Sequence, residues 1–139
     1  MNIPKRLQPH IDAAFPAHYI TIATTLADGY AQISPRGSTQ VYDDAHLSTW
    51  ERGIGRSAAE IHDGTKMTFF YSNFELRPQG MAFVRLYGTA KVHRIGPVYD
   101  RVWERLIDPE KRGDPEKKGF AVLCAIERVE DLRGKPIAE

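Results

Sequence analysis

The residues of this chain that are suited to chemistry are concentrated between Ser34 and Tyr71. Within that stretch, Ser57-Ala58-Ala59-Glu60 has the spacing of a capping box, in which the serine and glutamate side chains each accept a backbone N–H of the first turn. The pattern predicts a helix from Ser57 to His62. Open N–H groups and the positive dipole end of a helix start attract anions, and Arg56 stands directly before it. The pattern therefore indicates a phosphate site, although an ordinary helix cap without a ligand fits the same residues.

The loop before this helix, residues 50–55, has a composition that suits a bound ligand. It contains the aromatic residue Trp50, the cation Arg52 and two glycines, and Arg36 lies upstream. Glycine allows backbone to approach a ligand closely, and an aromatic ring supplies a flat apolar wall. This context strengthens the phosphate hypothesis, because cations, flexible backbone and an apolar surface occur together.

Composition limits the classes of protein that fit. The chain has 139 residues, of which 42% are hydrophobic and 27% are charged, which is typical of one globular domain spanning residues 1–139. A formal charge of +1 gives no electrostatic argument for nucleic acid or for an anionic membrane as a partner. No segment has the apolar length of a signal peptide or of a membrane span, so we expect a cytoplasmic protein.

Cysteine and histidine usage argues against a metal site. The single cysteine, Cys124, excludes an intrachain disulfide, and its apolar surroundings predict a buried, inert thiol. The five histidines, at positions 10, 18, 46, 62 and 93, are unclustered and lack metal-ligand spacing, so we interpret them as surface or structural residues. No motif of a serine hydrolase, a P-loop or a zinc protease occurs, and the sequence identifies no catalytic acid or base.

The elements that position these residues are mainly strands. Alternating and β-branched segments predict about six strands, at residues 19–26, 30–34, 46–49, 66–72, 81–93 and 120–129, with the chain also extended toward Val41. Short helices are expected at residues 4–15, at 57–62 and from Gly96-Pro97 onward, and residues 108–119 are expected to form a mobile surface loop. Strands linked mainly by hairpins indicate a mainly β fold: a six-stranded antiparallel barrel that closes on itself and so removes its edges.

Three segments carry a resemblance to a known family: AQISPRGS, DDAHLSTWERGIGRSAAEIHDGTKMTFFY and VRLYGTAKV. Together they resemble the pyridoxamine 5'-phosphate oxidase-like family of FMN-binding split β-barrels, over roughly residues 19–93. The resemblance implies FMN bound at a homodimer interface. By position it implies Arg56 and Ser57 as phosphate ligands, Thr49 and Trp50 beside the flavin, Arg36 or Ser38 as a second-strand contact, Arg52 as a further cation, and Arg85 as the basic residue of the long strand.

Two departures from the oxidase argue against vitamin B6 chemistry. Only DLRGKPIAE follows the last predicted strand, where the oxidase has a longer substrate-binding segment, and Phe83 aligns with a glutamine common in the oxidase. The resemblance therefore implies an FMN-dependent oxidoreductase that acts on another small organic substrate. Three alternatives remain: a reductase that binds the deazaflavin F420, a non-enzymatic flavin-storing or redox-sensing protein, and a haem-binding protein on the same fold.

Overall fold

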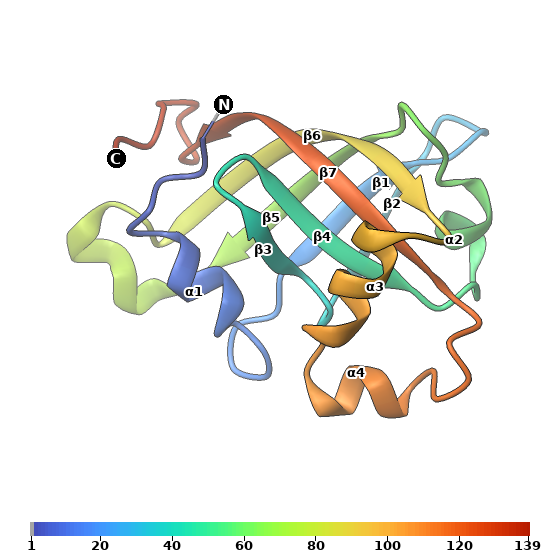
Figure 1. Cartoon of the computed structure of the whole chain (residues 1–139). Helices are drawn as coiled ribbons and strands as arrows, with labels where there is room; N and C mark the ends of the chain where they lie inside the picture. Colours follow the sequence, from blue (N-terminus) through green and yellow to red (C-terminus); the bar gives the residue numbers. More distant parts are fainter. Residues whose placement is uncertain (1) are drawn as a thin grey trace.

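The structure is a computed structural model that describes residues 2–139, apart from the side chain of Ser57. It consists of one antiparallel sheet of seven strands in the order β2-β1-β5-β6-β7-β4-β3, with short helices around it (Figure 1). The strands are β1 (Thr21–Thr25), β2 (Ala31–Pro35), β3 (Gln40–Asp43), β4 (His46–Glu51), β5 (Lys66–Ser72), β6 (Phe83–His93) and β7 (Phe120–Glu130). The helices are α1 (Gln8–Asp12), α2 (Arg56–Glu60), α3 (Pro97–Glu104), α4 (Asp108–Arg112) and the 3₁₀ helix η1 (Phe74–Gln79).

The mainly β, antiparallel class is confirmed, but two details of the predicted barrel are wrong. The sheet has seven strands rather than six, because the extended stretch around Val41 pairs with β4 as the separate strand β3. The sheet is also open, with β2 and β3 as its two edges. The β1–β2 pairing extends one residue past Pro35, where the Arg36 N–H donates to the Ile20 carbonyl at 2.9 Å.

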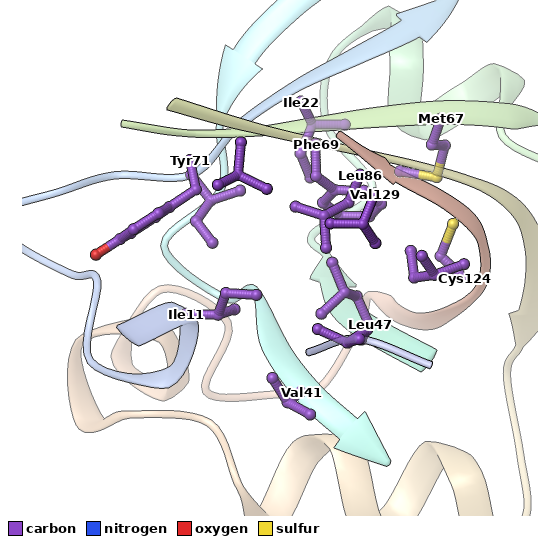
Figure 2. Close-up of a cluster of buried hydrophobic side chains, with 14 of the residues drawn as sticks. Ile11, Ile22, Val41, Leu47, Met67, Phe69, Tyr71, Leu86, Cys124 and Val129 are labelled. Carbon is purple, nitrogen blue, oxygen red and sulfur yellow. The ribbon is translucent and has the colours of Figure 1, made fainter. Parts of the chain in front are cut away.

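The core lies on the inner face of the curved sheet (Figure 2). Side chains of every second residue point to this face, so Ile22, Phe69 and Leu86 from three neighbouring strands meet there. Ile11 of helix α1 and Leu7, directly before this helix, add to the core and are almost fully or fully buried. Burial of each such side chain stabilises the fold by about 1.5–3 kcal/mol, so this face supplies most of the driving force for folding.

The helices are shorter than the sequence predicts at two of three places. Helix α1 covers Gln8–Asp12 instead of residues 4–15, because the chain before it forms a turn in which Leu7 N–H donates to the Pro4 carbonyl at 2.9 Å. Helix α2 begins at Arg56 and ends at Glu60. Helix α3 begins at Pro97 as expected, and it buries Val102 against the outer side of the sheet, beside Trp50 and Ala121.

Candidate functional site

A cavity of about 280 Å³ opens where the end of β2 faces the end of β4. It is lined by residues that flank these two strands, by the loop to α2 and by one residue of α4: Tyr19, Pro35, Arg36, Gly37, Trp50, Glu51, Arg52, Ile54 and Glu110. The tertiary structure thus brings together three of the residues singled out from the sequence, namely Arg36, Trp50 and Arg52. We take this cavity as the candidate functional site.

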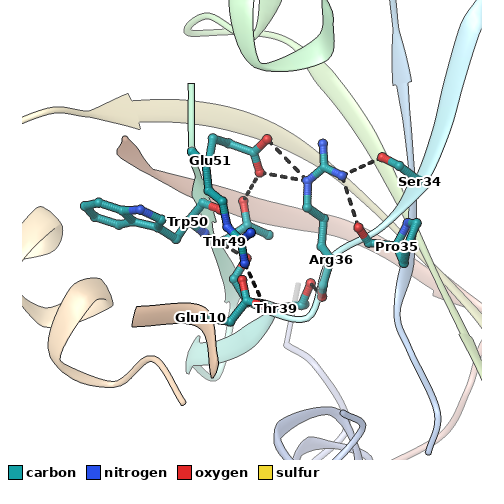
Figure 3. Close-up of polar contacts among 10 residues, drawn as sticks. Ser34, Pro35, Arg36, Thr39, Thr49, Trp50, Glu51 and Glu110 are labelled. Carbon is teal, nitrogen blue, oxygen red and sulfur yellow. Dashed lines mark hydrogen bonds and ion pairs between the residues drawn. The ribbon is translucent and has the colours of Figure 1, made fainter. Parts of the chain in front are cut away.

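Arg36 and Glu51 form an ion pair across the cavity (Figure 3). The Arg36 Nε donates to the two carboxylate oxygens of Glu51 at 3.0 and 3.3 Å, and Nη1 donates to the Ser34 hydroxyl and, at 3.1 Å, to the Pro35 carbonyl. Glu51 is only 2% exposed, and the hydroxyl of Thr49 donates to it at 3.1 Å. A carboxylate shielded from water needs such donors, so Arg36 and Thr49 together hold Glu51 in place.

Arg52 is the more available of the two cavity arginines. Its Nη2 lies 3.3 Å from Oε2 of Glu110, which reaches the cavity from α4. Its Nε and Nη1 groups make no hydrogen bond to any residue in the described part of the chain, and 37% of its side chain is exposed. Because a guanidinium carries five N–H donors, Arg52 keeps donors free for an anion while it pairs with Glu110.

Ser38 and Thr49 do not line the cavity but support it, and Trp50 lines it with only a small part of its surface exposed. The Ser38 hydroxyl accepts the backbone N–H of Trp50 at 3.0 Å and donates to its carbonyl at 3.3 Å. The ring of Trp50 is buried against Tyr99 and Trp103, with centroids 5.1 and 5.0 Å away. The open apolar surface of the cavity instead comes from residues that the sequence did not single out, Tyr19 at 46% and Ile54 at 76% exposure.

The segment 108–119 is ordered structure rather than the mobile loop predicted from its charge. It contains α4, and Asp114 in its middle is buried. The Asp114 carboxylate accepts Trp50 Nε1–H at 2.9 Å, Gly119 N–H at 2.8 Å and Lys118 N–H at 2.9 Å. Burial of Asp114 opposes its ionisation, but these donors outweigh burial and lower its pKa below the ordinary value.

Close packing at Gly119 also holds the segment 108–119 against the end of β4. A Cβ atom at this position would lie 2.1 Å from the Glu51 carbonyl oxygen and 2.9 Å from Trp50 Nε1, so only glycine lets the two segments approach. The segment from α4 to β7 is therefore fixed against the end of β4. This fixes Glu110 beside Arg52.

Two of the remaining predicted site residues, Arg56 and Arg85, do not line this cavity. Arg56 is 61% exposed and pairs with Asp28 of the β1–β2 turn at 3.0 Å. The side chain of Ser57 lies outside the described residues. Arg85, on β6, pairs with Glu130 at 3.4 Å, at the opposite end of the β6–β7 ladder from the residues next to Trp50. In one chain, therefore, neither Arg56 nor Arg85 lines the cavity.

Three residues that line the cavity, Tyr19, Glu51 and Glu110, were not predicted as site residues from the sequence. Tyr19 is the first residue of the predicted strand 19–26, and Glu51 follows the predicted strand 46–49 by two residues, so both lie near strand ends, where side chains reach the rim of a sheet. Glu110 lies in a segment rich in both charges, and nothing in its local sequence distinguishes it from its charged neighbours. Its role depends on a contact with Arg52 that bridges 58 positions of the chain, counted from their residue numbers (110 − 52).

The described part of the chain lacks two structural features, a cluster of metal-ligating side chains and a helix of membrane-spanning length. Within residues 2–139, no three histidine, cysteine, aspartate or glutamate side chains come close enough to hold a metal ion. In the same described part of the chain, no helix has the length and apolar character that a membrane crossing requires.

Several solved structures share this fold. HupZ of Group A Streptococcus has a TM-score of 0.73 at 21% identity over 99% of both chains. A candidate pyridoxamine 5'-phosphate oxidase of Lactobacillus delbrueckii has a TM-score of 0.66 and 25% sequence identity, and the match covers 93% of both chains. An FMN-binding protein of Syntrophomonas wolfei has a TM-score of 0.64 and 14% sequence identity, and the match covers 91% of this chain and 84% of the other. No family model and no curated protein matches the chain.

These neighbours confirm the resemblance seen in the sequence at the level of the fold. The chain shares its fold with proteins named as candidate pyridoxamine 5'-phosphate oxidases and as an FMN-binding protein. The residues of the cavity also fit a phosphorylated flavin in chemical type. Two guanidinium groups suit a phosphate, and Tyr19 and Ile54 supply exposed apolar surface for a ring system.

Proposed function

We propose that this protein binds FMN in the cavity at Arg36 and Arg52 and acts as an oxidoreductase on a small organic substrate. The observation that carries the proposal is the placement of two arginines beside the exposed side chains of Tyr19 and Ile54, in a fold that FMN-binding proteins share. A phosphate dianion is best held by guanidinium donors, and the isoalloxazine ring by an apolar slot. The cavity supplies both kinds of contact within one opening.

Each residue has a separate part in this proposal. Arg52 donates its unused N–H groups to the phosphate, while Arg36 adds positive charge and keeps Glu51 in place. Tyr19 and Ile54 cover the apolar part of the ring. The bound flavin supplies hydride transfer, and the protein supplies orientation and protection from water. Ser38 and Thr49 act indirectly, because their hydroxyl groups fix Trp50 and Glu51.

We also propose that a second copy of the chain completes the site. The cavity of about 280 Å³ is smaller than the roughly 300–1,000 Å³ typical of small-molecule sites. The edge strand β2 exposes Ile33 at 68%, and Tyr30 just before it is 76% exposed. Exposed apolar edge strands in soluble proteins are commonly covered by another chain. In such a homodimer Arg85, on the outer side of β6, is available to the cavity of the other copy.

The first experiment is to identify the cofactor of the purified protein. We expect an absorbance spectrum of an oxidised flavin, and release of FMN that mass spectrometry identifies. If the released cofactor is F420, the cofactor of the proposed site is this deazaflavin and not FMN. A colourless protein that takes up no added FMN would refute it. Reduction of the bound flavin by NAD(P)H during steady-state turnover supports an oxidoreductase, and its absence with every electron donor supports a flavin-storing protein.

Substitution of Arg52 tests the phosphate contact. Arg52→Ala should weaken FMN binding by roughly tenfold or more, because it removes a charge-assisted hydrogen bond. Arg56→Ala is the matched control, since Arg56 is an exposed arginine that pairs with Asp28 outside the cavity. Equal effects of the two substitutions, measured by flavin fluorescence titration on folded protein, would remove the assignment to Arg52.

The dimer is tested by sedimentation velocity. The chain has a mass of 15.7 kDa, and we expect a species of twice that mass. Ile33→Lys should produce monomers and weaken FMN binding, whereas Ile95→Lys, at an exposed isoleucine after β6, should change neither. A monomer that holds FMN with undiminished affinity would contradict a site shared between two copies.

A further inference from the structure

Strand β2 has a free edge that carries unbonded backbone groups. The strand lies at one end of the sheet and pairs with β1 on its other side. The Leu26 N–H donates to the Tyr30 carbonyl at 2.8 Å, so Tyr30 is bonded toward β1. Because bonded and non-bonded positions alternate along an antiparallel ladder, the N–H and C=O groups of Ala31 and Ile33 point away from β1. No group in the described part of the chain bonds to them there.

The side chains of β2 alternate in the reverse of the usual sense. Ala31, Ile33 and Pro35 are exposed, whereas the polar residues Gln32 and Ser34 are partly buried. An antiparallel strand with one solvated face normally carries its polar residues on that face. Exposed apolar side chains and an unbonded edge together indicate a strand that pairs with another chain.

A second copy of β2 bonds these groups when the two strands pair antiparallel about Gln32. In this register Ala31 of each copy lies opposite Ile33 of the other. Both residues point their N–H and C=O groups outward, so each forms a hydrogen-bonded pair with the residue opposite it. The side chain of Ile33 then covers Ala31 of the partner subunit, which removes apolar surface from water.

Neighbouring registers leave a backbone group of this edge without a partner. Pairing about Ile33 places the Ala31 carbonyl opposite Pro35, which has no N–H to donate. Pairing about position 34 places the Ile33 carbonyl opposite the same proline. Pairing about Ala31 places Ile33 opposite Gly29, whose N–H is already used within the β1–β2 turn. The register about Gln32 bonds every group.

We propose that two copies of the chain pair through β2 in this register and that Tyr30 of the partner subunit enters the proposed flavin site. The inference rests on the homodimer and the FMN site of the proposed function. Opposite residues of paired strands have their side chains on the same face, and Tyr30 of the partner subunit lies opposite Ser34. The Ser34 hydroxyl accepts a hydrogen bond from Arg36, which lines the cavity. The pairing therefore brings an aromatic ring that is 76% exposed in the single chain next to that arginine.

A face-to-face dimer is the competing arrangement. It would cover the outer side of the sheet and bring Arg85 to the cavity of the other copy. It would leave the edge groups of Ala31 and Ile33 without protein partners, and these groups therefore favour the edge pairing.

Cysteine cross-linking tests the register. Gln32→Cys places two thiols at the two-fold axis, where opposite Cα atoms of a non-hydrogen-bonded pair lie about 4.5 Å apart, within the range that a disulfide spans. Mild oxidation should give a covalent dimer of twice 15.7 kDa on a non-reducing gel. Thr25→Cys, at an exposed residue of β1 one strand further in, is the matched control and should stay monomeric on that gel. The native Cys124 is buried and does not compete.

Sedimentation velocity separates failure of this pairing from failure of the homodimer. If the wild type is a dimer and Gln32→Cys, folded by circular dichroism, does not cross-link, the edge pairing is overturned and the homodimer stands. Equal cross-linking of Thr25→Cys would also overturn the edge pairing. A monomeric wild type would overturn both.

Mixed dimers test the contribution of Tyr30. Tyr30→Ala and Arg52→Ala should each weaken FMN binding by roughly tenfold. When the two variants exchange subunits, one site of each mixed dimer combines an intact Arg52 with an intact Tyr30 of the partner subunit. High-affinity FMN sites should therefore reappear in a flavin fluorescence titration of the mixture. If the wild type binds FMN tightly and an exchanged mixture recovers no such site, the role of Tyr30 is overturned while the FMN site stands.

Discussion

Arg36 and Glu51 connect the edge strand β2 to β4 by an ion pair, across a gap that backbone hydrogen bonds do not close. The two residues are 15 positions apart in the chain, and their strands are separated by four others in the sheet. Side chains thus hold together the two sides of a sheet that remains open in its backbone. The same pair forms one wall of the proposed flavin site.

Loss of this ion pair should destabilise the fold. Arg36→Ala leaves the buried Glu51 carboxylate without its cation, and the expected cost is about 3 kcal/mol in the free energy of unfolding. Urea unfolding followed by circular dichroism measures it. Arg56→Ala breaks an exposed pair and should cost less than about 1 kcal/mol. If both variants lose the same stability, the connection between β2 and β4 does not depend on Arg36.

Asp114 should make the protein sensitive to acid. Because its N–H donors lower its pKa in the folded state, its ionised form stabilises the fold above the unfolded-state pKa of about 3.9. That stabilisation is lost as the pH falls through the lower folded-state pKa. Asp114→Asn should therefore be less stable than the wild type near pH 7 and should lose less stability as the pH falls below about 4.

The pH experiment has a control in the same chain. Glu116→Gln removes a carboxylate whose side chain is 73% exposed and should change the free energy of unfolding by less than about 1 kcal/mol. Free energies of unfolding from urea titrations at each pH provide the comparison. Parallel curves for Asp114→Asn and the wild type would show that the bonds to Trp50 and Gly119 do not stabilise the ionised carboxylate.

Glu110 should compete with FMN phosphate for Arg52, if the proposed function is correct. The Glu110 carboxylate lies 3.3 Å from Arg52 Nη2 and lowers the positive charge that a phosphate meets. Glu110→Gln should therefore raise FMN affinity by about fivefold, in the range of an exposed ion pair. Glu116→Gln, in which the substituted glutamate pairs with Lys118, should leave the affinity as it is. Weaker FMN binding in Glu110→Gln would assign this carboxylate to the binding of flavin instead.

Cys124 should be unreactive in the folded protein. Its side chain is fully buried, and burial raises the pKa of the thiol to about 12. At pH 8 the thiolate fraction is then lower by about a thousandfold than for a thiol at its ordinary pKa. Alkylation by iodoacetamide, followed by mass spectrometry, should label the protein only in urea. Rapid labelling without urea would show that β7 opens readily.

Local sequence was sufficient to predict the strands, the turn and the helix start that depend on interactions between nearby residues. Alternation placed β5, β6 and β7 correctly, and Asp28-Gly29 marked the β1–β2 turn, where Gly29 has a φ of 88°. Pro97 marked the start of α3. These predictions succeeded because side-chain periodicity and turn chemistry depend on residues within a few positions of each other.

Only the tertiary structure decided which charged and polar residues meet. Trp50 and Asp114 are 64 positions apart, and their hydrogen bond converts a segment that looks mobile into part of the site. Each of the four arginines singled out from the sequence pairs with a carboxylate, and only Arg36 and Arg52 reach the cavity. Sequence by itself determined a β protein with basic residues near a helix start. The cavity depends on contacts between distant segments, which no local pattern encodes.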